Sequence, residues 1–215
     1  MEDRGKQMEV STCCVILAAG EGKRMNSEQP KVMAEVLGKP MLYYVLKSCL
    51  ELDCEDVCVV TGFKNHIVDA YLEKNFPNVH TVFQSERLGT AHAVKCAENF
   101  MKKCESDSVI VLNGDAPFID SKTLHTTLER HLNKNNSATV ISALLKDPTG
   151  YGRIIRDNYG LLQAIVEHKD ASKEQRNINE ISSGAYIFDK NDLLFSIDKI
   201  KNTNSQKEYY LPDTI

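Results

Sequence analysis

Short apolar segments alternate with helical segments along most of this chain, and that alternation limits the folds it can adopt. The apolar segments have the length of strands and lie at residues 13–17, 56–61, 79–84, 108–112 and 138–144. Helices are expected between them, at about 64–75, from 90 to about 104, and at 121–135. This order predicts an α/β fold with a mostly parallel central sheet and helices on both of its faces.

The pattern changes after Leu145. Residues 147–153 are rich in turn-forming types, and strand-like pieces follow at 152–156, 161–167 and 184–188. Ligands of open parallel sheets bind beyond the carboxyl ends of the strands. We therefore interpret the residues after 145 as an extension of the same domain that covers such a crevice.

Length and composition exclude several classes of protein. The 215 residues are enough for one large domain, and the formal net charge of −4 argues against a nucleic-acid partner. Residues 1–12 read as a polar tail without the apolar core of a signal peptide, and no apolar run is long enough for a membrane span. The seven cysteines are scattered without a CxxC pair. We expect reduced, mostly buried thiols in a cytoplasmic protein.

The segment after the first apolar run has the composition of a phosphate-binding loop. Four small residues follow the expected strand: Ala18, Ala19, Gly20 and Gly22. Small residues let backbone N–H groups approach a ligand closely and adopt turns that bulkier residues disfavour. Arg24 and Lys31 add two cations. Backbone donors with an arginine and a lysine match the charge of a triphosphate, which favours a phosphate site here.

Two better-known phosphate loops do not fit this segment. A dinucleotide-binding fingerprint would need a third glycine where Met25 stands. A P-loop would need a glycine at Leu17 and a serine or threonine at Arg24. The remaining alternative is an ordinary connection between a strand and a helix, with solvated charges.

The tripeptide Asn113-Gly114-Asp115 directly follows a buried strand. Mg²⁺ prefers oxygen ligands and commonly uses one or two carboxylates together with substrate phosphates. Asn-Gly is also a strong turn dipeptide, so an ordinary turn is the alternative. Beside a phosphate loop, we favour Asp115 as a magnesium ligand.

Polar residues at other strand ends complete the candidate site. Gln84 can pair with the edge of a nucleobase because its amide both donates and accepts, and Gly89-Thr90 begins a helix with Thr90 as a plausible N-cap. Glu167, at the end of an apolar strand, could accept hydrogen bonds from sugar hydroxyls. The alternatives are an exposed glutamine, a routine helix cap and a solvated strand end. We expect His92 to be a packed helix residue rather than a catalyst.

Taken in order, these segments resemble the sugar-1-phosphate nucleotidyltransferases, most closely the uridylyltransferase domain of the bifunctional enzyme that makes UDP-N-acetylglucosamine. The resemblance runs from about Val15 to the last residue. The matching blocks are LAAGEGKRM (17–25), PK (30–31), Gln84 with LGTAHA (88–93), NGD (113–115), DPTGYGRI (147–154), IVEHKDA (165–171), EQR (174–176) and KEYYLPD (207–213).

The resemblance implies a Rossmann-like nucleotidyltransferase fold over residues 13–215 and a role for each matching residue. The uridine would contact Leu17, Ala18, Ala19, Gly20, Gln84, Gly89 and Thr90. The phosphates would face Arg24 and Lys31, and Asp115, next to Asn113 and Gly114, would bind Mg²⁺. Gly152, Glu167 and the residue at Ser182 would contact the sugar. The implied reaction converts UTP and N-acetylglucosamine 1-phosphate to UDP-N-acetylglucosamine and pyrophosphate.

This sequence departs from the family's pattern in three places. Ser182 stands where the family has a sugar-contacting asparagine, and Asn113 stands where some relatives have tyrosine. The sequence also stops at Ile215, before the family's second metal-binding residue and its β-helix acetyltransferase domain. We therefore expect a truncated domain without acetyltransferase activity, and a monomer or weak oligomer.

Three other functions stay open on the sequence. The first is a related enzyme that uses another base or sugar, and the second is a nucleotide-sugar-binding protein or fragment without turnover. A dehydrogenase is the third and fits least, because the glycine fingerprint is incomplete.

Overall fold

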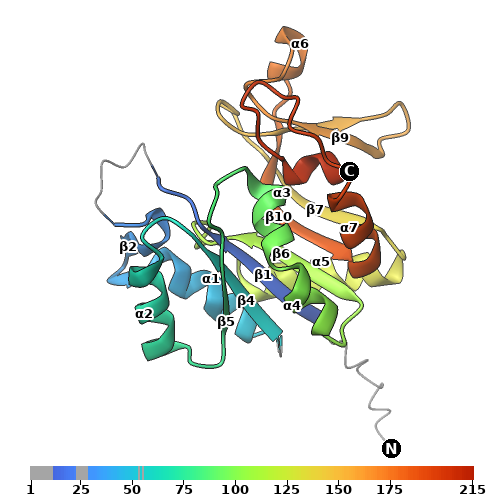
Figure 1. The fold of residues 1–215 in the computed structure, drawn as a ribbon. Coiled ribbons are helices and arrows are strands. Elements are labelled where there is room, and N and C mark those ends of the chain that lie inside the picture. Colours follow the sequence, from blue (N-terminus) through green and yellow to red (C-terminus); the bar gives the residue numbers. More distant parts are fainter. Residues whose placement is uncertain (1–11, 23–28, 53, 55) are drawn as a thin grey trace, which may run out of the picture.

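The computed structural model describes residues 12–22, 29–52, 54 and 56–215, which form helices around a central sheet (Figure 1). The order of the sheet is β5-β4-β1-β6-β10-β8-β9, and β7 pairs with β10. Its strands are β1 (Thr12–Ala18), β4 (Asp56–Thr61), β5 (His80–Phe83), β6 (Ser108–Asn113), β7 (Ala138–Leu144), β8 (Arg153–Arg156), β9 (Leu162–Val166) and β10 (Glu180–Asp189).

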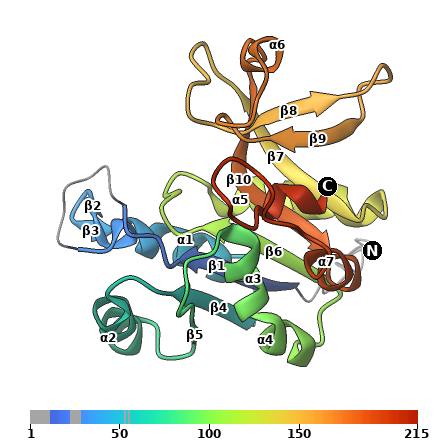
Figure 2. The same cartoon turned by 45° about the horizontal axis from the view of Figure 1, so that its top comes forward.

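The first four of these strands in sheet order, β5, β4, β1 and β6, are parallel to one another. The strands after residue 138 pair antiparallel instead, beginning with β10 against β6. Figure 2 shows that β8, β9 and α6 (Lys173–Arg176) stand together at one end of the sheet. The expected α/β fold is confirmed, and its parallel part carries the carboxyl strand ends at which ligands bind.

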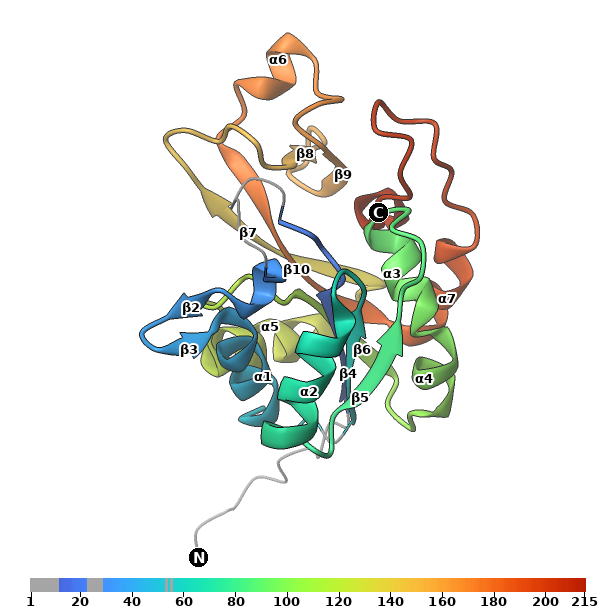
Figure 3. The same cartoon turned by 60° about the vertical axis from the view of Figure 1, so that its left-hand side comes forward.

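Helices cover both faces of the sheet because β1 is apolar on both sides. Cys14 and Ile16 face one core with α1 (Met41–Leu50), α2 (Asn65–Asn75) and α5 (Ser121–Asn133). Cys13 and Val15 alternate with them and face a second core with α3 (Thr90–Cys96), α4 (Glu98–Lys103) and α7 (Lys190–Ile197). Successive side chains of a strand point to opposite faces, so a run that is apolar at every position is buried on both. Figure 3 shows the two helix layers on either side of the sheet.

Several elements differ from the sequence-based expectation. The expected helix from 90 to about 104 is two helices that meet at Ala97, and β10 begins at Glu180 rather than at 184. The sequence-based expectation did not include α1, α7, the hairpin of β2 (Glu35–Val36) and β3 (Lys39–Pro40), or the short helices η2 (Lys31–Met33) and η3 (Leu211–Thr214).

The seven cysteines are all free thiols, and six of them are buried. Within the described ranges, no helix combines the length and the apolar character needed to cross a bilayer.

Candidate functional site

Two adjoining cavities open at the carboxyl ends of β1 and β6. The first has a volume of about 470 Å³ and the second of about 720 Å³. Both are lined by the same five residues: Leu17, Lys31, Thr90, Asn113 and Asp115. A ligand in one cavity would therefore meet a ligand in the other at this junction.

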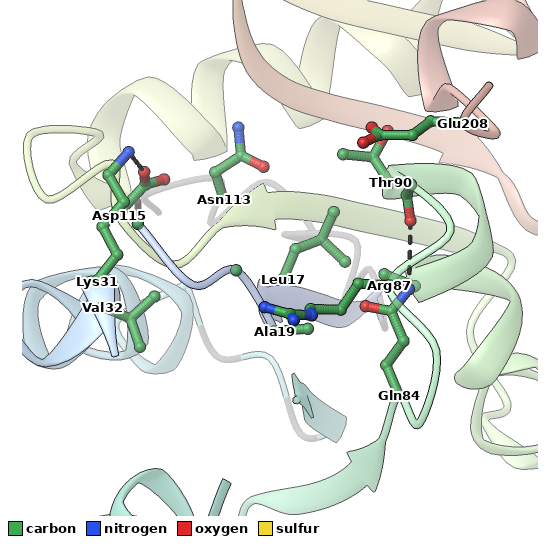
Figure 4. A pocket seen from close by; sticks show the side chains of 14 residues that line it. Leu17, Ala19, Lys31, Val32, Gln84, Arg87, Thr90, Asn113, Asp115 and Glu208 are labelled. Atoms are coloured by element: carbon green, nitrogen blue, oxygen red, sulfur yellow. Dashed lines mark hydrogen bonds and ion pairs between the residues drawn. The ribbon is translucent and has the colours of Figure 1, made fainter. Parts of the chain in front are cut away.

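The structure brings most of the predicted site residues to these cavities. Besides the junction, the first cavity is lined by the predicted residues Ala19, Gly20, Gln84 and Gly89 (Figure 4). The second is lined by the predicted residues Gly152, Glu167 and Ser182. Outside the shared junction, the lining residues that the resemblance assigns to the nucleotide and to the sugar thus fall into separate cavities.

Three predicted residues stand apart from this arrangement. Ala18 and Gly114 are not among the lining residues. The Ala18 side chain packs into the core with Ile16, because both lie on the same face of β1. The backbone N–H of Gly114 donates to the carbonyl of Leu17 at 2.9 Å, which joins the ends of β6 and β1. Arg24 lies outside the described residues.

Lys31 and Asp115 form an ion pair at the junction. Lys31 begins the short helix η2 after Pro30, and Asp115 follows the end of β6 by two residues. Gly22 brings the glycine loop close to this lysine, since an added Cβ at Gly22 would lie 2.7 Å from Lys31 Cβ. The junction therefore offers one cation, one carboxylate and a closely apposed backbone.

The buried Gln84 side chain is held in one orientation. Its Nε2 donates to the Gly89 carbonyl at 3.3 Å and lies 2.9 Å from His92 Nδ1. With both amide hydrogens directed at protein atoms, Gln84 Oε1 is the atom left to accept a hydrogen bond from a ligand. His92 thus acts as a positioning residue, a role that its place in the sequence did not reveal.

The C-terminal segment holds the loop that begins α3. The backbone of Tyr209 donates to the Leu88 carbonyl at 2.7 Å and accepts from the Ala91 N–H at 2.9 Å. The Thr90 hydroxyl accepts from the Leu211 N–H at 2.9 Å. The prediction that Thr90 is the N-cap of this helix is wrong: the N-cap is Gly89, and the threonine hydroxyl is bonded to Leu211 instead.

Gly89 is the residue that permits this contact, so replacing it with alanine is expected to damage the first cavity. Its φ is +118°, and an added Cβ would lie 2.7 Å from the Tyr209 backbone nitrogen and closer still to the carbonyl oxygen of that residue. We expect Gly89→Ala to lower the free energy of unfolding by roughly 2–3 kcal/mol and to weaken nucleotide binding, because strain and a backbone clash add. Urea denaturation and nucleotide titration would measure the two effects.

Gly160→Ala is the matched control for that substitution. Gly160 also has a positive φ, of +79°, but no atom lies within 4 Å of the position of an added Cβ. We expect it to lose stability from backbone strain alone and to bind nucleotide normally. Equal effects of the two substitutions on binding would contradict the role of the Tyr209 contact.

The second cavity has a polar floor where β10 is irregular. The register of β10 against β7 shifts between Ser182 and Tyr186, and their hydroxyl groups lie 3.0 Å apart. Gly184 lies within this irregular stretch with a φ of +80°, and an added Cβ there would clash with Asn113 Nδ2. The irregular strand thus places Ser182 in the cavity and lets the Asn113 side chain pack against Gly184.

Besides Asp115 at the junction, Glu167 is the carboxylic acid among the described residues that line the second cavity. It lies beside Gly152, where an added Cβ would be 3.3 Å from Glu167 Oε1, and Gly152 accepts a hydrogen bond from the Ser182 N–H at 2.9 Å. Burial raises the pKa of Glu167 above its ordinary value of 4.5, and the charges of Asp170 and Asp213 raise this pKa further. A desolvated carboxylate of this kind is a strong acceptor for hydroxyl groups.

The raised pKa of Glu167 predicts how stability depends on pH. The folded state binds the proton of Glu167 more readily than the unfolded state does, so protonation of this carboxyl stabilises the fold. This contribution is complete below the ordinary pKa of 4.5. It is lost as the pH rises through the raised folded pKa. Glu167→Gln cannot ionise, so we expect its stability relative to the unchanged protein to increase with pH across this window.

Urea denaturation at a series of pH values would measure this effect, with Glu73→Gln as the control at an exposed glutamate. Stability curves for Glu167→Gln and the unchanged protein that stay parallel through the window would contradict the assignment.

Arg153 supports the walls of the second cavity and was not predicted. The residue is only 1% exposed. It donates to the Tyr151 carbonyl and to the Arg176 carbonyl, and it lies 3.2 Å from His168 Nδ1. These contacts hold the chain on either side of Gly152 and Glu167. The contacts with His168 and Arg176 join residues 15 and 23 positions apart, so no local pattern indicated them.

The fold and the paired cavities define an α/β protein with two adjoining cavities at the carboxyl ends of parallel strands, where open sheets of this kind bind their ligands. A family model described as nucleotidyl transferase matches residues 13–212. The chain belongs to this family.

Two curated relatives show which members of this family the chain is similar to. The chain is 44% identical over 203 residues to the bifunctional protein GlmU of Clostridium tetani (strain Massachusetts / E88), covering 94% of this chain and 44% of that protein. It is 46% identical over 201 residues to the bifunctional protein GlmU of Acetivibrio thermocellus, covering 94% and 43%. The chain therefore spans less than half the length of these relatives.

A solved structure of a UDP-glucose pyrophosphorylase in complex with UDP-glucose has a similar fold. The TM-score is 0.78 at 18% sequence identity, and the match covers 95% of this chain and 85% of that one. At this identity the likeness concerns the fold alone.

Proposed function

We propose that this chain transfers a uridylyl group from UTP to N-acetylglucosamine 1-phosphate, forming UDP-N-acetylglucosamine and releasing pyrophosphate. The observation that carries the proposal is the junction, where Lys31 and Asp115 line both cavities. A transfer between two bound substrates needs such a shared boundary, because the reacting atoms must meet there. The proposal places the enzyme in the cytoplasm, where UTP is made.

The first cavity suits a uridine nucleotide. Gln84 Oε1 is left to accept a hydrogen bond, which the imide N–H of uracil can donate. Ala19, Gly20 and Gly22 line the same cavity with little side-chain bulk, so backbone groups are accessible to the ligand. These features support a pyrimidine base at Gln84 and phosphates along the glycine loop.

The second cavity suits a sugar phosphate. Glu167 can accept from sugar hydroxyls, and the missing side chain of Gly152 leaves room beside it. The Ser182 hydroxyl is already bonded to Tyr186, so it offers a ligand less than a free asparagine amide would. We infer that Glu167 contributes more to sugar binding than Ser182 does.

In the proposed reaction, an oxygen of the sugar phosphate forms a bond to the α-phosphorus of UTP, and the bond to the bridging oxygen of pyrophosphate breaks. Lys31 would donate to the oxygens that gain negative charge during this in-line attack. Asp115 would orient Lys31 through their ion pair. The protein mainly positions the substrates and stabilises charge, and no residue of the chain needs to form a covalent intermediate.

Asp115 also fits as a magnesium ligand. The described residues include no cluster of three or more His, Cys, Asp or Glu side chains that could hold a metal. A single carboxylate beside bound phosphates is nevertheless a common arrangement for Mg²⁺. When bound, Mg²⁺ would offset charge on the α-phosphate and the leaving pyrophosphate.

The stereochemistry of transfer would test this mechanism. The probe is one stereoisomer of a UTP analogue in which sulfur replaces a non-bridging oxygen on the α-phosphorus. A single in-line attack inverts the configuration at that phosphorus. We expect an inverted product, and retention would contradict direct transfer.

A panel of nucleoside triphosphates and sugar 1-phosphates would test the substrates. A higher kcat/KM for another pair would favour a related transferase, and binding without turnover with any pair would favour a non-catalytic protein.

A further inference from the structure

A second cation, Arg87, lines the first cavity away from the junction. Among the described residues that line this cavity, Lys31 and Arg87 are the cations. Arg87 is not among the residues that line the second cavity. A ligand group that contacts Arg87 would therefore lie in the first cavity, on the side proposed for the nucleotide and away from that proposed for the sugar.

Arg87 connects two loops of that cavity. Its Nη1 donates to Glu21 Oε2 at 2.8 Å, and its guanidinium lies 5.6 Å from the centre of the Phe63 ring. Glu21 stands between Gly20 and Gly22 in the glycine loop. Figure 4 shows the Arg87 side chain reaching from the loop after β5 toward Ala19.

We propose that Arg87 binds the β- and γ-phosphates of the nucleotide by exchanging its Glu21 partner for phosphate oxygens. The inference rests on the proposed nucleotide site. Lys31 lies at the junction, where the α-phosphate must meet the sugar phosphate. Arg87 is held by the glycine loop, along which the remaining phosphates would continue.

The chemistry of the Arg87–Glu21 pair permits this exchange. Both side chains are partly exposed, at 47% and 32%, so their ion pair is weak and easily replaced. A guanidinium presents its N–H donors in a planar fork that suits two phosphate oxygens as well as a carboxylate. Phe63 supports the guanidinium in this position. The carboxylate thus holds Arg87 close to the glycine loop when no phosphate is bound.

Binding measurements on two substitutions test this role. Arg87→Gln removes the cation, and we expect it to raise the Kd of UTP roughly tenfold or more and that of UMP less than about twofold. Glu21→Gln removes the competing carboxylate, so we expect the Kd of UTP to fall while that of UMP is unchanged. Isothermal titration with UTP, UMP and pyrophosphate would give these constants.

Arg156→Gln is the matched control, because it also breaks a surface arginine–glutamate pair but lies outside both cavities. We expect it to leave all three dissociation constants unchanged. The opposite effects of the two test substitutions on UTP distinguish phosphate binding from a simple tether between loops.

Two outcomes would overturn the inference. If Arg87→Gln and Glu21→Gln weaken UTP and UMP equally, the pair only tethers the loops or supports the base. If Arg87→Gln changes no constant, or the unchanged protein binds neither UTP nor pyrophosphate, Arg87 has no phosphate role. If the dissociation constants change as expected but no sugar phosphate is turned over, the proposed function would be contradicted and this inference would stand.

Discussion

Asp115→Asn is expected to reduce kcat for pyrophosphate release by roughly a thousandfold or more, with the fold intact. The substitution keeps the size of the side chain but removes the charge that pairs with Lys31 and would bind Mg²⁺. Both losses fall on the transition state, in which charge accumulates at the junction. Turnover with UTP, N-acetylglucosamine 1-phosphate and Mg²⁺ would measure the effect, and thermal unfolding would check the fold.

Asp198→Asn is the matched control for Asp115→Asn. Asp198 also pairs with a lysine, Lys95, but lies outside both cavities. Normal turnover is expected from this variant. Turnover within a few-fold of normal in Asp115→Asn itself would refute the role of this carboxylate.

Lys31→Met is expected to have the second largest effect, a loss of roughly a hundredfold in kcat, or about 3 kcal/mol of transition-state stabilisation. Methionine keeps much of the aliphatic chain but cannot donate to the transferring phosphate. Steady-state kinetics would separate the effects on kcat and KM. A rise confined to the KM for UTP would mean that Lys31 binds only the ground state.

The ion pair between Lys31 and Asp115 also predicts that the two substitutions are not additive. Once Asp115 is neutral, Lys31 has lost its partner, so the second substitution should cost less than it does alone. The control for Lys31 is Lys95→Met, since Lys95 pairs with Asp198 outside the cavities. Full additivity of the two losses would indicate that the residues act independently.

The parallel half of the fold could be predicted because its signals are local. β1, β4 and β6 are short and apolar at their central positions, and each lies where it was expected. Strand ends in a parallel sheet lie along one edge, so the order of the segments was enough to place Gln84 and Asp115 in one crevice. Both residues line the first cavity, at opposite ends of it in Figure 4.

The parts that were missed depend on contacts between distant segments. β10 begins earlier than expected because Glu180 to Ser182 pair with β7, although Ser182 and Ser183 weaken the apolar pattern there. The contact of Tyr209 with the loop at Gly89 joins residues 120 positions apart, and Arg153 contacts His168 and Arg176, which lie 15 and 23 positions away. Helix α1 is different, because Leu42, Val45, Leu46 and Cys49 have helical spacing and could have been recognised.

The site therefore depends on a charge arrangement that individual motifs do not reveal. Among the described residues, the two cations that line the first cavity are paired with carboxylates, Lys31 with Asp115 and Arg87 with Glu21. Each lysine or arginine is thus held near the position that a phosphate would take. In the proposed site, a phosphate would replace the Glu21 carboxylate as the partner of Arg87.

Formation of UDP-N-acetylglucosamine by the 215-residue chain tests the central claim most directly. The chain would be incubated with Mg²⁺, UTP and N-acetylglucosamine 1-phosphate, with Asp115→Asn as the background, and the product would be identified by mass. We expect product and an equal amount of pyrophosphate, because both cavities and their junction lie within these residues. A folded chain that binds UTP but forms no product above the Asp115→Asn background would contradict the claim that it contains a complete transferase site.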